Sequence, residues 1–284
     1  MTRPPVALKR RIATELRSLR EQKGLTLEAA AEQAEVTKSS LSRFENGHSA
    51  PKIHTMRALM TLYGASAEKR EELERLAKEA ARRGWSTSIF GEGSSVPDWL
   101  RTYVGLEATA TSLHTYSLFV PGLLQTPEYA RAVISAGGRE GDELERRVRL
   151  RIARQQLITD GKSAPAIHAV LDEGVLHRQM GSADITQEQL AHLVELADEP
   201  NVTIQILPWT AGAASASVGN GFVILGLDPD PPLVYLESYE VAHYIESESE
   251  TQRFRAAFDR LASSALDPDE TRCLLVAASK TPRG

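Results

Sequence analysis

Apolar residues recur at helical spacing in three stretches of the first 80 residues. The stretches hold Ile12, Leu16 and Leu19, then Met56, Leu59, Met60 and Tyr63, and then Leu73, Leu76, Ala77 and Ala80. This spacing places the apolar side chains of each stretch on one face of a helix. Between the first two stretches, the pattern of residues 25–47 predicts two short helices joined by a tight turn. We expect these four helices to close one small core; the third stretch predicts a fifth helix, with Ser66 as N-cap, that either completes this core or leads out of it.

The second short helix, predicted from Thr37 to Asn46, has two distinct faces. At about 100° per residue, Leu41 and Phe44 fall on one side of this helix, and the polar residues fall together on the other. These polar residues are Lys38, Ser39, Ser42 and Arg43. The Thr37 hydroxyl is a good N-cap acceptor for the amide of Ser39 or Ser40. One face is therefore expected to pack against the core, and the other remains free to contact a ligand.

The first short helix is expected to start after Thr26 as its N-cap. It contains the small or apolar residues Leu27, Ala30, Ala31 and Ala34, which let two helices cross closely. Val36 is expected to fill the turn that follows. Two helices joined in this way have the layout of a DNA-reading helix-turn-helix.

A change in composition near residues 84–97 predicts a linker, because glycine, serine and proline replace the charged helical pattern there. We divide the chain into a helical DNA-binding domain at 1–83, a linker at 84–97, and a regulatory and dimerisation domain at 98–280. In the last domain, helices are predicted over 98–110, 127–136 (Thr126 as N-cap) and 144–158. Capping boxes are predicted at Thr186 with Gln189 and at Asp267 with Glu270.

Short aliphatic runs predict strands in the same domain, over 166–171, 202–207, 221–227 and 233–236. The last three follow one another closely, so we expect an antiparallel meander. The predicted fold class is an all-α bundle of four to five helices followed by an α+β domain with a small, mainly antiparallel sheet.

Charge is distributed unevenly along the chain, whose formal net charge is −5. Residues 1–83 hold 17 Lys and Arg against 11 Asp and Glu, so this part is basic and the remainder is acidic. A DNA duplex attracts the basic part and repels the rest, which favours docking through the first domain.

The composition, 42% hydrophobic and 25% charged, is ordinary for a protein with two cores. The basic first residues lead into no apolar signal segment, and no stretch reaches the roughly 18 apolar residues of a membrane helix. We expect a cytoplasmic protein, associated with the nucleoid when bound to DNA. The single cysteine, Cys273, excludes a disulfide within the chain; its apolar neighbours predict that it is buried.

Residues 16–51, LRSLREQKGLTLEAAAEQAEVTKSSLSRFENGHSAP, resemble the helix-turn-helix of the XRE and Cro/phage-repressor family. The most specific part runs from Ser40 to Gly47, which resembles the family's serine-x-x-glutamate-x-glycine ending of the recognition helix. Two residues depart from the pattern: Glu35 stands at the usual turn glycine, and Ala30 at the usual leucine. Glu35 leaves the exact turn geometry open.

The resemblance implies that the amino end of the recognition helix enters the major groove. It implies base or phosphate contacts from Lys38, Ser39, Ser42 and Arg43, with Arg43 as the main base reader because its planar fork matches guanine. Phosphate contacts are implied for Thr37, His48 and Lys52, with Arg10 and Arg11 as further candidates. The complete predicted DNA-binding set is Thr37, Lys38, Ser39, Ser40, Ser42, Arg43, His48 and Lys52.

The second domain also resembles a known group. Segments such as VPDWLRTYVGLE, RIARQQLI, AVLDEGVLHR and VTIQILPW are similar to the domain of unknown function that follows the helix-turn-helix in actinobacterial WhiJ-like regulators. This resemblance implies a small partner protein encoded nearby, in a pair that is similar to an antitoxin and its toxin.

We interpret the chain as a sequence-specific transcriptional regulator that binds double-stranded DNA as a homodimer at a palindromic operator. A single small domain makes too few contacts for the usual specific affinity, which two domains together supply. The second domain is expected to sense a partner protein or a small ligand. The alternative is an antitoxin-like protein that mainly captures a small partner, with DNA binding for autoregulation.

An enzyme is the third class considered, and the sequence offers little for it. Glu240 and His243 have the spacing of two metal ligands on a helix, but a di-metal site needs this motif twice. His177 near acidic residues is more typical of a surface group. We therefore predict no catalytic residues, no metal and no cofactor. The glycine-rich segment 210–221 predicts a mobile lid over a pocket, a segment that brings backbone N–H groups to an anionic ligand, or an ordinary loop. Trp209 before it is a candidate pocket wall or partner anchor, but as a lone tryptophan it is expected in the core.

Overall fold

The computed structural model describes residues 5–47, 50–80, 96–159, 164–228, 230–238 and 241–281. The chain divides into two compact units, Met1–Thr109 and Ala110–Gly284, which are described separately. Most of the predicted linker lies outside the described residues, so the domain boundaries at 83 and 98 stay predictions.

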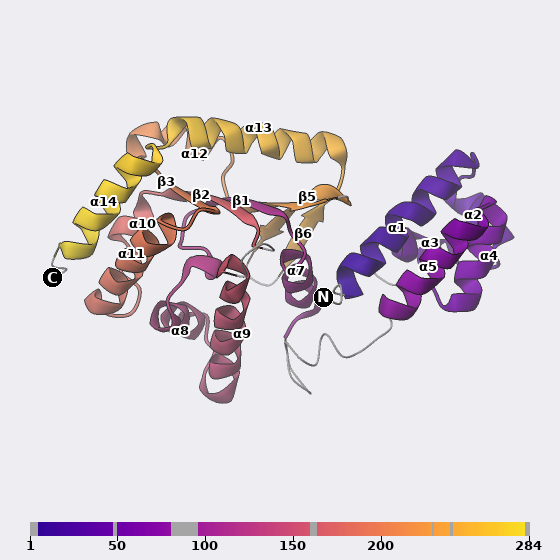
Figure 1. Ribbon diagram of the computed structural model, residues 1–284, viewed down its shortest axis with the longest axis horizontal. Helices are drawn as coiled ribbons and strands as arrows, with labels where there is room; N and C mark the ends of the chain where they lie inside the picture. The colour runs from indigo at the N-terminus through magenta and orange to yellow at the C-terminus, as the bar shows by residue number, and fades with distance from the viewer. Residues whose placement is uncertain are drawn as a thin grey trace. The chain divides into compact units, whose positions relative to one another are not determined.

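The first unit is a helical bundle (Figure 1). Its described helices are α1 (Pro5–Gln22), α2 (Leu27–Gln33), α3 (Lys38–Glu45), α4 (Ile53–Tyr63), α5 (Ala67–Ala80) and α7 (Asp98–Glu107). The Ser66 hydroxyl caps α5, as predicted, by accepting a hydrogen bond from the Lys69 amide at 3.2 Å.

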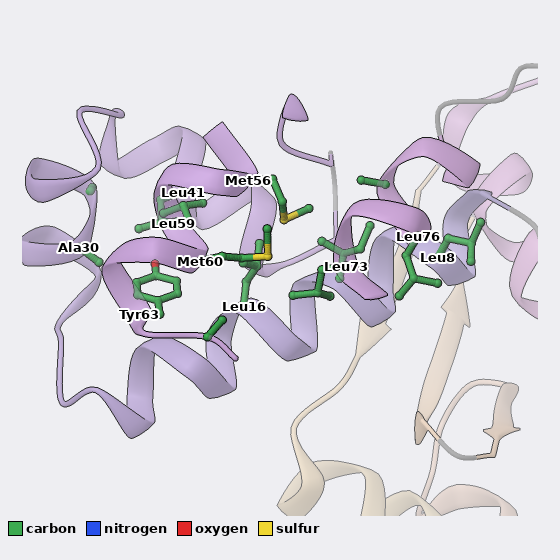
Figure 2. Close-up of a cluster of buried hydrophobic side chains, with 14 residues drawn as sticks. Leu8, Leu16, Ala30, Leu41, Met56, Leu59, Met60, Tyr63, Leu73 and Leu76 are labelled. Carbon is green, nitrogen blue, oxygen red and sulfur yellow. The ribbon is translucent and has the colours of Figure 1, made fainter. Parts of the chain in front are cut away.

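One hydrophobic core joins α1 to α5 (Figure 2). Its fully buried side chains include Leu16, Leu41, Met56, Leu59 and Leu73. Burying each such side chain contributes roughly 2 kcal/mol of favourable transfer free energy. Because Leu73 and Leu76 of α5 belong to this cluster, the fifth helix completes the core.

The second unit is an α+β domain, so the predicted fold class is confirmed. Its described strands are β1 (Ser112–Ser117), β2 (Ala166–Asp172), β3 (Val202–Leu207), β4 (Phe222–Leu227), β5 (Asp230–Glu237) and β6 (Ala242–Ile245). Its described α-helices are α8 (Pro127–Ala136), α9 (Gly141–Thr159), α10 (Gly174–His177), α11 (Ala183–Ala197), α12 (Gly212–Ala216), α13 (Glu248–Ser264) and α14 (Pro268–Lys280), with short 3-10 turns η1 (Gly122–Leu124) and η3 (Trp209–Ala211).

The described strands form one mixed sheet in the order β3-β2-β1-β4-β5-β6. The pairs β1–β2 and β2–β3 are parallel, and the pairs β1–β4, β4–β5 and β5–β6 are antiparallel. The parallel half follows from its helical connections, which carry the chain back before each new strand, whereas short loops join β4, β5 and β6.

Helix α13 lies along one face of this sheet, and α8 and α9 lie on the opposite side (Figure 1). Phe258 and Leu261 of α13 are buried against Tyr116, Val170 and Phe222 of the sheet. One hydrophobic cluster of the second unit therefore lies where the parallel and antiparallel halves meet.

The predicted meander is wrong in one respect. It placed β3 beside β4, but β3 lies at the far edge of the sheet and the meander consists of β4, β5 and β6. Strands β1 and β6 and helix α13 were not predicted. The strand order depends on pairing between residues more than 100 positions apart, such as Tyr116 with Phe222, which local patterns do not encode.

Three local predictions in the second unit are also corrected. Thr186 and Gln189 do not form the predicted capping box, because α11 begins earlier, with Ser182 as its N-cap. Both side chains are buried and accept hydrogen bonds from backbone amides outside the helix, those of Met180 and Thr126. Cys273 is exposed on the outer face of α14, and Trp209 is 59% exposed. The Thr126 cap and the capping box of Asp267 with Glu270 are confirmed.

Candidate nucleic-acid interface

Helices α2 and α3 begin at hydroxyl caps, as predicted. Thr26 Oγ1 accepts a hydrogen bond from the Ala29 amide (3.2 Å), and Thr37 Oγ1 accepts one from the Ser40 amide (3.1 Å). Each cap satisfies an amide that has no partner within its helix. The caps therefore fix where α3 starts and which of its residues face outward.

The turn between α2 and α3 closes with Glu35 in a left-handed conformation. The Val36 amide donates to the Ala31 carbonyl (3.0 Å), and the Glu35 amide donates to the Glu32 carbonyl (3.1 Å). These two bonds form a Schellman motif, in which glycine is the usual residue at the position that Glu35 occupies. Glu35 has a φ of 53°. The turn therefore has the geometry that the helix-turn-helix resemblance implies, although Glu35 and not glycine occupies the left-handed position.

The predicted division of α3 into two faces is confirmed. Leu41 is completely buried, and Phe44 packs against the same core. On the other side, Lys38, Ser39 and Arg43 are exposed, and Ser40 and Ser42 are half-buried. Helix α3 therefore presents a continuous polar surface from its amino end to its last turn.

Arg43 and Lys52 are exposed, and neither side chain bonds to another residue in the described part of the chain. Arg43 lies in the last turn of α3, and Lys52 immediately precedes α4 without capping it through its side chain. Both cations are thus available to a ligand. His48 lies outside the described residues, so its predicted phosphate contact stays a prediction.

Lys38 is already engaged within the protein. Its ammonium group forms an ion pair with Glu28 of α2, and both side chains are largely exposed. The hydrogen bond from Lys38 lowers the pKa of Glu28 and so favours the charged carboxylate. A phosphate or base acceptor must compete with Glu28 for this cation.

The side chains of Arg10 and Arg11 are engaged within the first unit. Arg10 is only 6% exposed, so the prediction that it holds the DNA backbone is wrong. Arg11 donates to Glu72 of α5 at 2.6 Å. Both side chains therefore lie against the helical bundle.

The contact that orients α3 is a buried ion pair that the sequence analysis missed. Arg20 of α1 donates from Nε to Glu45 Oε1 and from NH2 to Glu45 Oε2, both at 2.9 Å, and from NH1 to the Leu25 carbonyl at 2.8 Å. The Glu45 side chain is 2% exposed. Tyr63 lies nearby, and burial followed by the charge of Glu45 raises the pKa of its hydroxyl. One signal was present, because Glu45 follows Leu41 by four residues and so shares its inward face.

The second unit contains no cluster of three or more His, Cys, Asp or Glu residues with metal-binding geometry among its described residues. His243 lies on strand β6, so the helical ligand spacing considered for Glu240 and His243 does not apply to His243; Glu240 lies outside the described residues. His177 contacts Glu173 at 3.4 Å, and its ring lies 4.7 Å from that of Trp209.

Exposed aromatic residues gather just after the carboxyl ends of the parallel strands. Phe119 follows β1 and is 46% exposed, with the Arg178 guanidinium 4.6 Å from its ring centre. Trp209 follows β3 and stacks on His177, and its amide donates to Glu173 at 2.7 Å. We call Phe119, His177, Arg178 and Trp209 the strand-end surface. Segment 210–221, for which the sequence left several interpretations open, begins within η3 beside this surface and continues into the short helix α12.

Comparison with known proteins gives two family matches. Residues 11–73 match the model of a helix-turn-helix domain, and residues 100–276 match a domain of unknown function, DUF5753. No curated protein and no solved structure matches the chain. Over the described residues, each helix is either too short or too polar for a membrane crossing.

Proposed function

The chain belongs to the DUF5753 family, and we propose that it is a sequence-specific DNA-binding transcriptional regulator of the XRE type. The helix-turn-helix domain supports DNA as the ligand of the first unit. The observation that carries the proposal is Arg43, an exposed guanidinium with no partner among the described residues, on a recognition helix that the Arg20 and Glu45 pair holds in place. A planar guanidinium group in this position can donate two hydrogen bonds to the two acceptors, O6 and N7, on the major-groove edge of a guanine.

The test is binding of the purified full-length chain to DNA from upstream of its own gene, measured by fluorescence anisotropy against a scrambled duplex over a salt series. Arg43→Ala is expected to lower affinity for the true operator by about 1 to 3 kcal/mol and to weaken discrimination among operator variants. Lys78→Ala is the matched control, because it removes an exposed cation of α5 instead of α3. Unchanged discrimination in Arg43→Ala would remove its role as base reader.

We further propose that the protein acts as a homodimer on a palindromic operator, in the cytoplasm and on the nucleoid, and that its second unit supplies dimerisation and senses a partner protein or small ligand. Two first units on one operator combine their contacts, which a single small domain needs for specific affinity. Analytical ultracentrifugation with and without operator tests this proposal; a monomer that binds one half-site with full affinity contradicts it.

The second candidate function is antitoxin-like capture of a small partner protein, and the strand-end surface favours it. Tryptophan and arginine are enriched among the residues that carry binding energy at protein interfaces. Here Arg178 lies over the ring of exposed Phe119, and exposed Trp209 lies against His177, the residue before Arg178. Such a role leaves DNA binding for autoregulation.

This candidate is tested with the product of a small adjacent gene. Co-purification that Trp209→Ala abolishes, while operator binding is retained, supports partner capture; co-purification unaffected by Trp209→Ala and Phe119→Ala excludes this surface. We propose no catalytic role, and turnover lost on His243→Ala would contradict that.

A further inference from the structure

Two consecutive hydrogen bonds connect α1 to a serine on the polar face of α3. Arg17 NH2 donates to Asn46 Oδ1 at 2.6 Å, and Asn46 Nδ2 donates to Ser42 Oγ at 3.2 Å. Asn46 is the C-cap of α3, and its own amide donates to the Ser42 carbonyl at 3.0 Å. The backbone thus holds the Asn46 side chain beside Ser42, one turn before it on the helix.

The chemistry of the three groups fixes the direction of both bonds. A guanidinium only donates, so the Asn46 atom that faces Arg17 is the amide oxygen. The amide nitrogen then faces Ser42, and because this nitrogen also only donates, Ser42 Oγ is the acceptor. The proton of the Ser42 hydroxyl is left over, and no acceptor for it occurs among the described residues.

We infer that Ser42 is a specificity-determining residue that donates its hydroxyl proton to an acceptor on a base edge, and that Asn46 and Arg17 position it to do so. This inference rests on the proposed function, since it requires α3 in the major groove. A serine normally discriminates little, because its hydroxyl serves as donor or acceptor. With Asn46 donating to it, Ser42 favours guanine or thymine, which present O6, N7 or O4, over cytosine, which presents only its N4 amino group.

The test changes the Ser42 hydroxyl from a hydrogen-bond donor to an acceptor toward DNA without substituting Ser42 itself. Asn46→Asp replaces the amide with a carboxylate of nearly the same shape, which only accepts. This carboxylate still accepts the hydrogen bond from Arg17 and also accepts one from the Ser42 hydroxyl, so that the oxygen of Ser42 is left to accept a hydrogen bond from a base.

The experiment uses operators selected from random duplexes with the full-length chain, and anisotropy titrations of all four base pairs at each position. The position of interest is the one at which Ser42→Ala abolishes the base preference. There the unmodified chain is expected to prefer guanine or thymine to cytosine by about fivefold, the size of one net hydrogen bond. In Asn46→Asp the preference is expected to reverse toward cytosine.

The ratio of affinities is the readout, because the added negative charge weakens binding to every duplex alike. Asn46→Asp in the Ser42→Ala chain is the matched control, which should show the same general weakening and no change in preference. A guanine or thymine preference that survives Asn46→Asp at this position, or the absence of any position whose base preference depends on Ser42, overturns this inference and leaves the proposed function intact. Absence of any sequence preference in the unmodified chain overturns the proposed function itself.

Discussion

Arg20 and Glu45 form a two-pronged ion pair between α1 and the last turn of α3, across 25 residues of sequence. Because the side chain of Glu45 is 2% exposed and that of Arg20 is 12% exposed, water screens the pair weakly. The NH1 group of Arg20 also holds the Leu25 carbonyl, at the start of the helix-turn-helix. One guanidinium therefore joins both ends of the DNA-reading segment to α1.

Arg20→Met is expected to destabilise the first unit by roughly 3 kcal/mol, because it removes the hydrogen bonds of Arg20 to the buried Glu45 carboxylate and, among the described residues, leaves it only the more distant Arg17, whose Nε lies 4.0 Å from Glu45 Oε2. Urea unfolding followed by circular dichroism measures this loss as a lower midpoint of the transition assigned to the first unit. Arg57→Met is the matched control, since Arg57 makes a similar two-pronged pair with Glu74 between α4 and α5 but is 61% exposed. The control should lower the unfolding midpoint much less than Arg20→Met does; equal losses would mean that burial of the pair contributes little.

Glu35→Gly is expected to stabilise the first unit by roughly 0.5 to 1 kcal/mol. At a φ of 53°, a residue with a Cβ is strained and glycine is not, although glycine loses more backbone entropy on folding. Gly64→Ala is the converse change, at a φ of +74° with no heavy atom within 4 Å of the added Cβ, and should destabilise. Thermal unfolding of both variants compares them, and a lower melting temperature for Glu35→Gly would show that its side chain stabilises the turn.

The sequence was sufficient for those parts of the fold that local physics decides. Caps at Thr26, Thr37 and Thr126 depend on a hydroxyl and amides two or three residues away, and all three form as predicted. The two faces of α3 follow from helical periodicity alone. The predicted interface is therefore placed correctly as a surface, although DNA contact by its residues stays a prediction.

Long-range partners account for what the sequence did not reveal. The spacing from Leu41 places Glu45 on the inward face of α3, but only the crossing of α1 and α3 shows that Arg20 is its partner. Thr186 and Gln189 have the spacing of a capping box, but the Gln189 side chain instead bonds the Thr126 amide and the Leu124 carbonyl from inside α11. Trp209 was expected in the core because tryptophan usually is, and nothing local indicates its position at an exposed strand end.

The stability of the second unit is expected to fall as the pH drops from about 6.5 to about 4, in part through His114. Burial beneath Phe258 of α13, with the charges of Arg255 and His168, lowers the pKa of His114 to about 4 from its usual 6.5, and Asp259 opposes this shift. In this window the unfolded chain binds a proton that the folded chain does not, so acid favours unfolding; the contribution is complete above pH 6.5.

His114→Gln removes this titration, because glutamine does not ionise. Urea unfolding of the second unit at several pH values between 7 and 5, where most carboxylates stay charged, should give a shallower pH dependence for the variant than for the unmodified chain. His192→Gln, at a histidine near Glu195 on the surface of α11, is the control. Parallel curves for His114→Gln and the unmodified chain would show that His114 titrates alike in the folded and unfolded states.

Lys52→Ala is expected to weaken binding to all duplexes alike and to lower the salt slope by about one unit, because a phosphate contact releases one counterion. Lys52 is exposed and unpaired among the described residues, at the start of α4 instead of on α3. Anisotropy titrations on operator and scrambled DNA over a salt series measure both quantities. A loss confined to the operator would make Lys52 a base reader.

Glu28→Gln is expected to strengthen DNA binding severalfold and to raise the salt slope by about one unit. In the free protein the Glu28 carboxylate holds the Lys38 ammonium, so DNA must displace a bound anion before Lys38 neutralises a phosphate. Without this carboxylate, Lys38 can neutralise a phosphate and no ion pair has to break first.

Glu32→Gln is the control, because it removes an exposed negative charge from the same helix. No ion pair of Glu32 occurs among the described residues, so its gain in DNA affinity measures only the general relief of charge repulsion. The gain from Glu28→Gln should therefore exceed that from Glu32→Gln, and should vanish when Lys38→Ala is added. Equal gains from the two glutamates, or a gain that persists without Lys38, would mean that the Lys38 ammonium does not reach DNA.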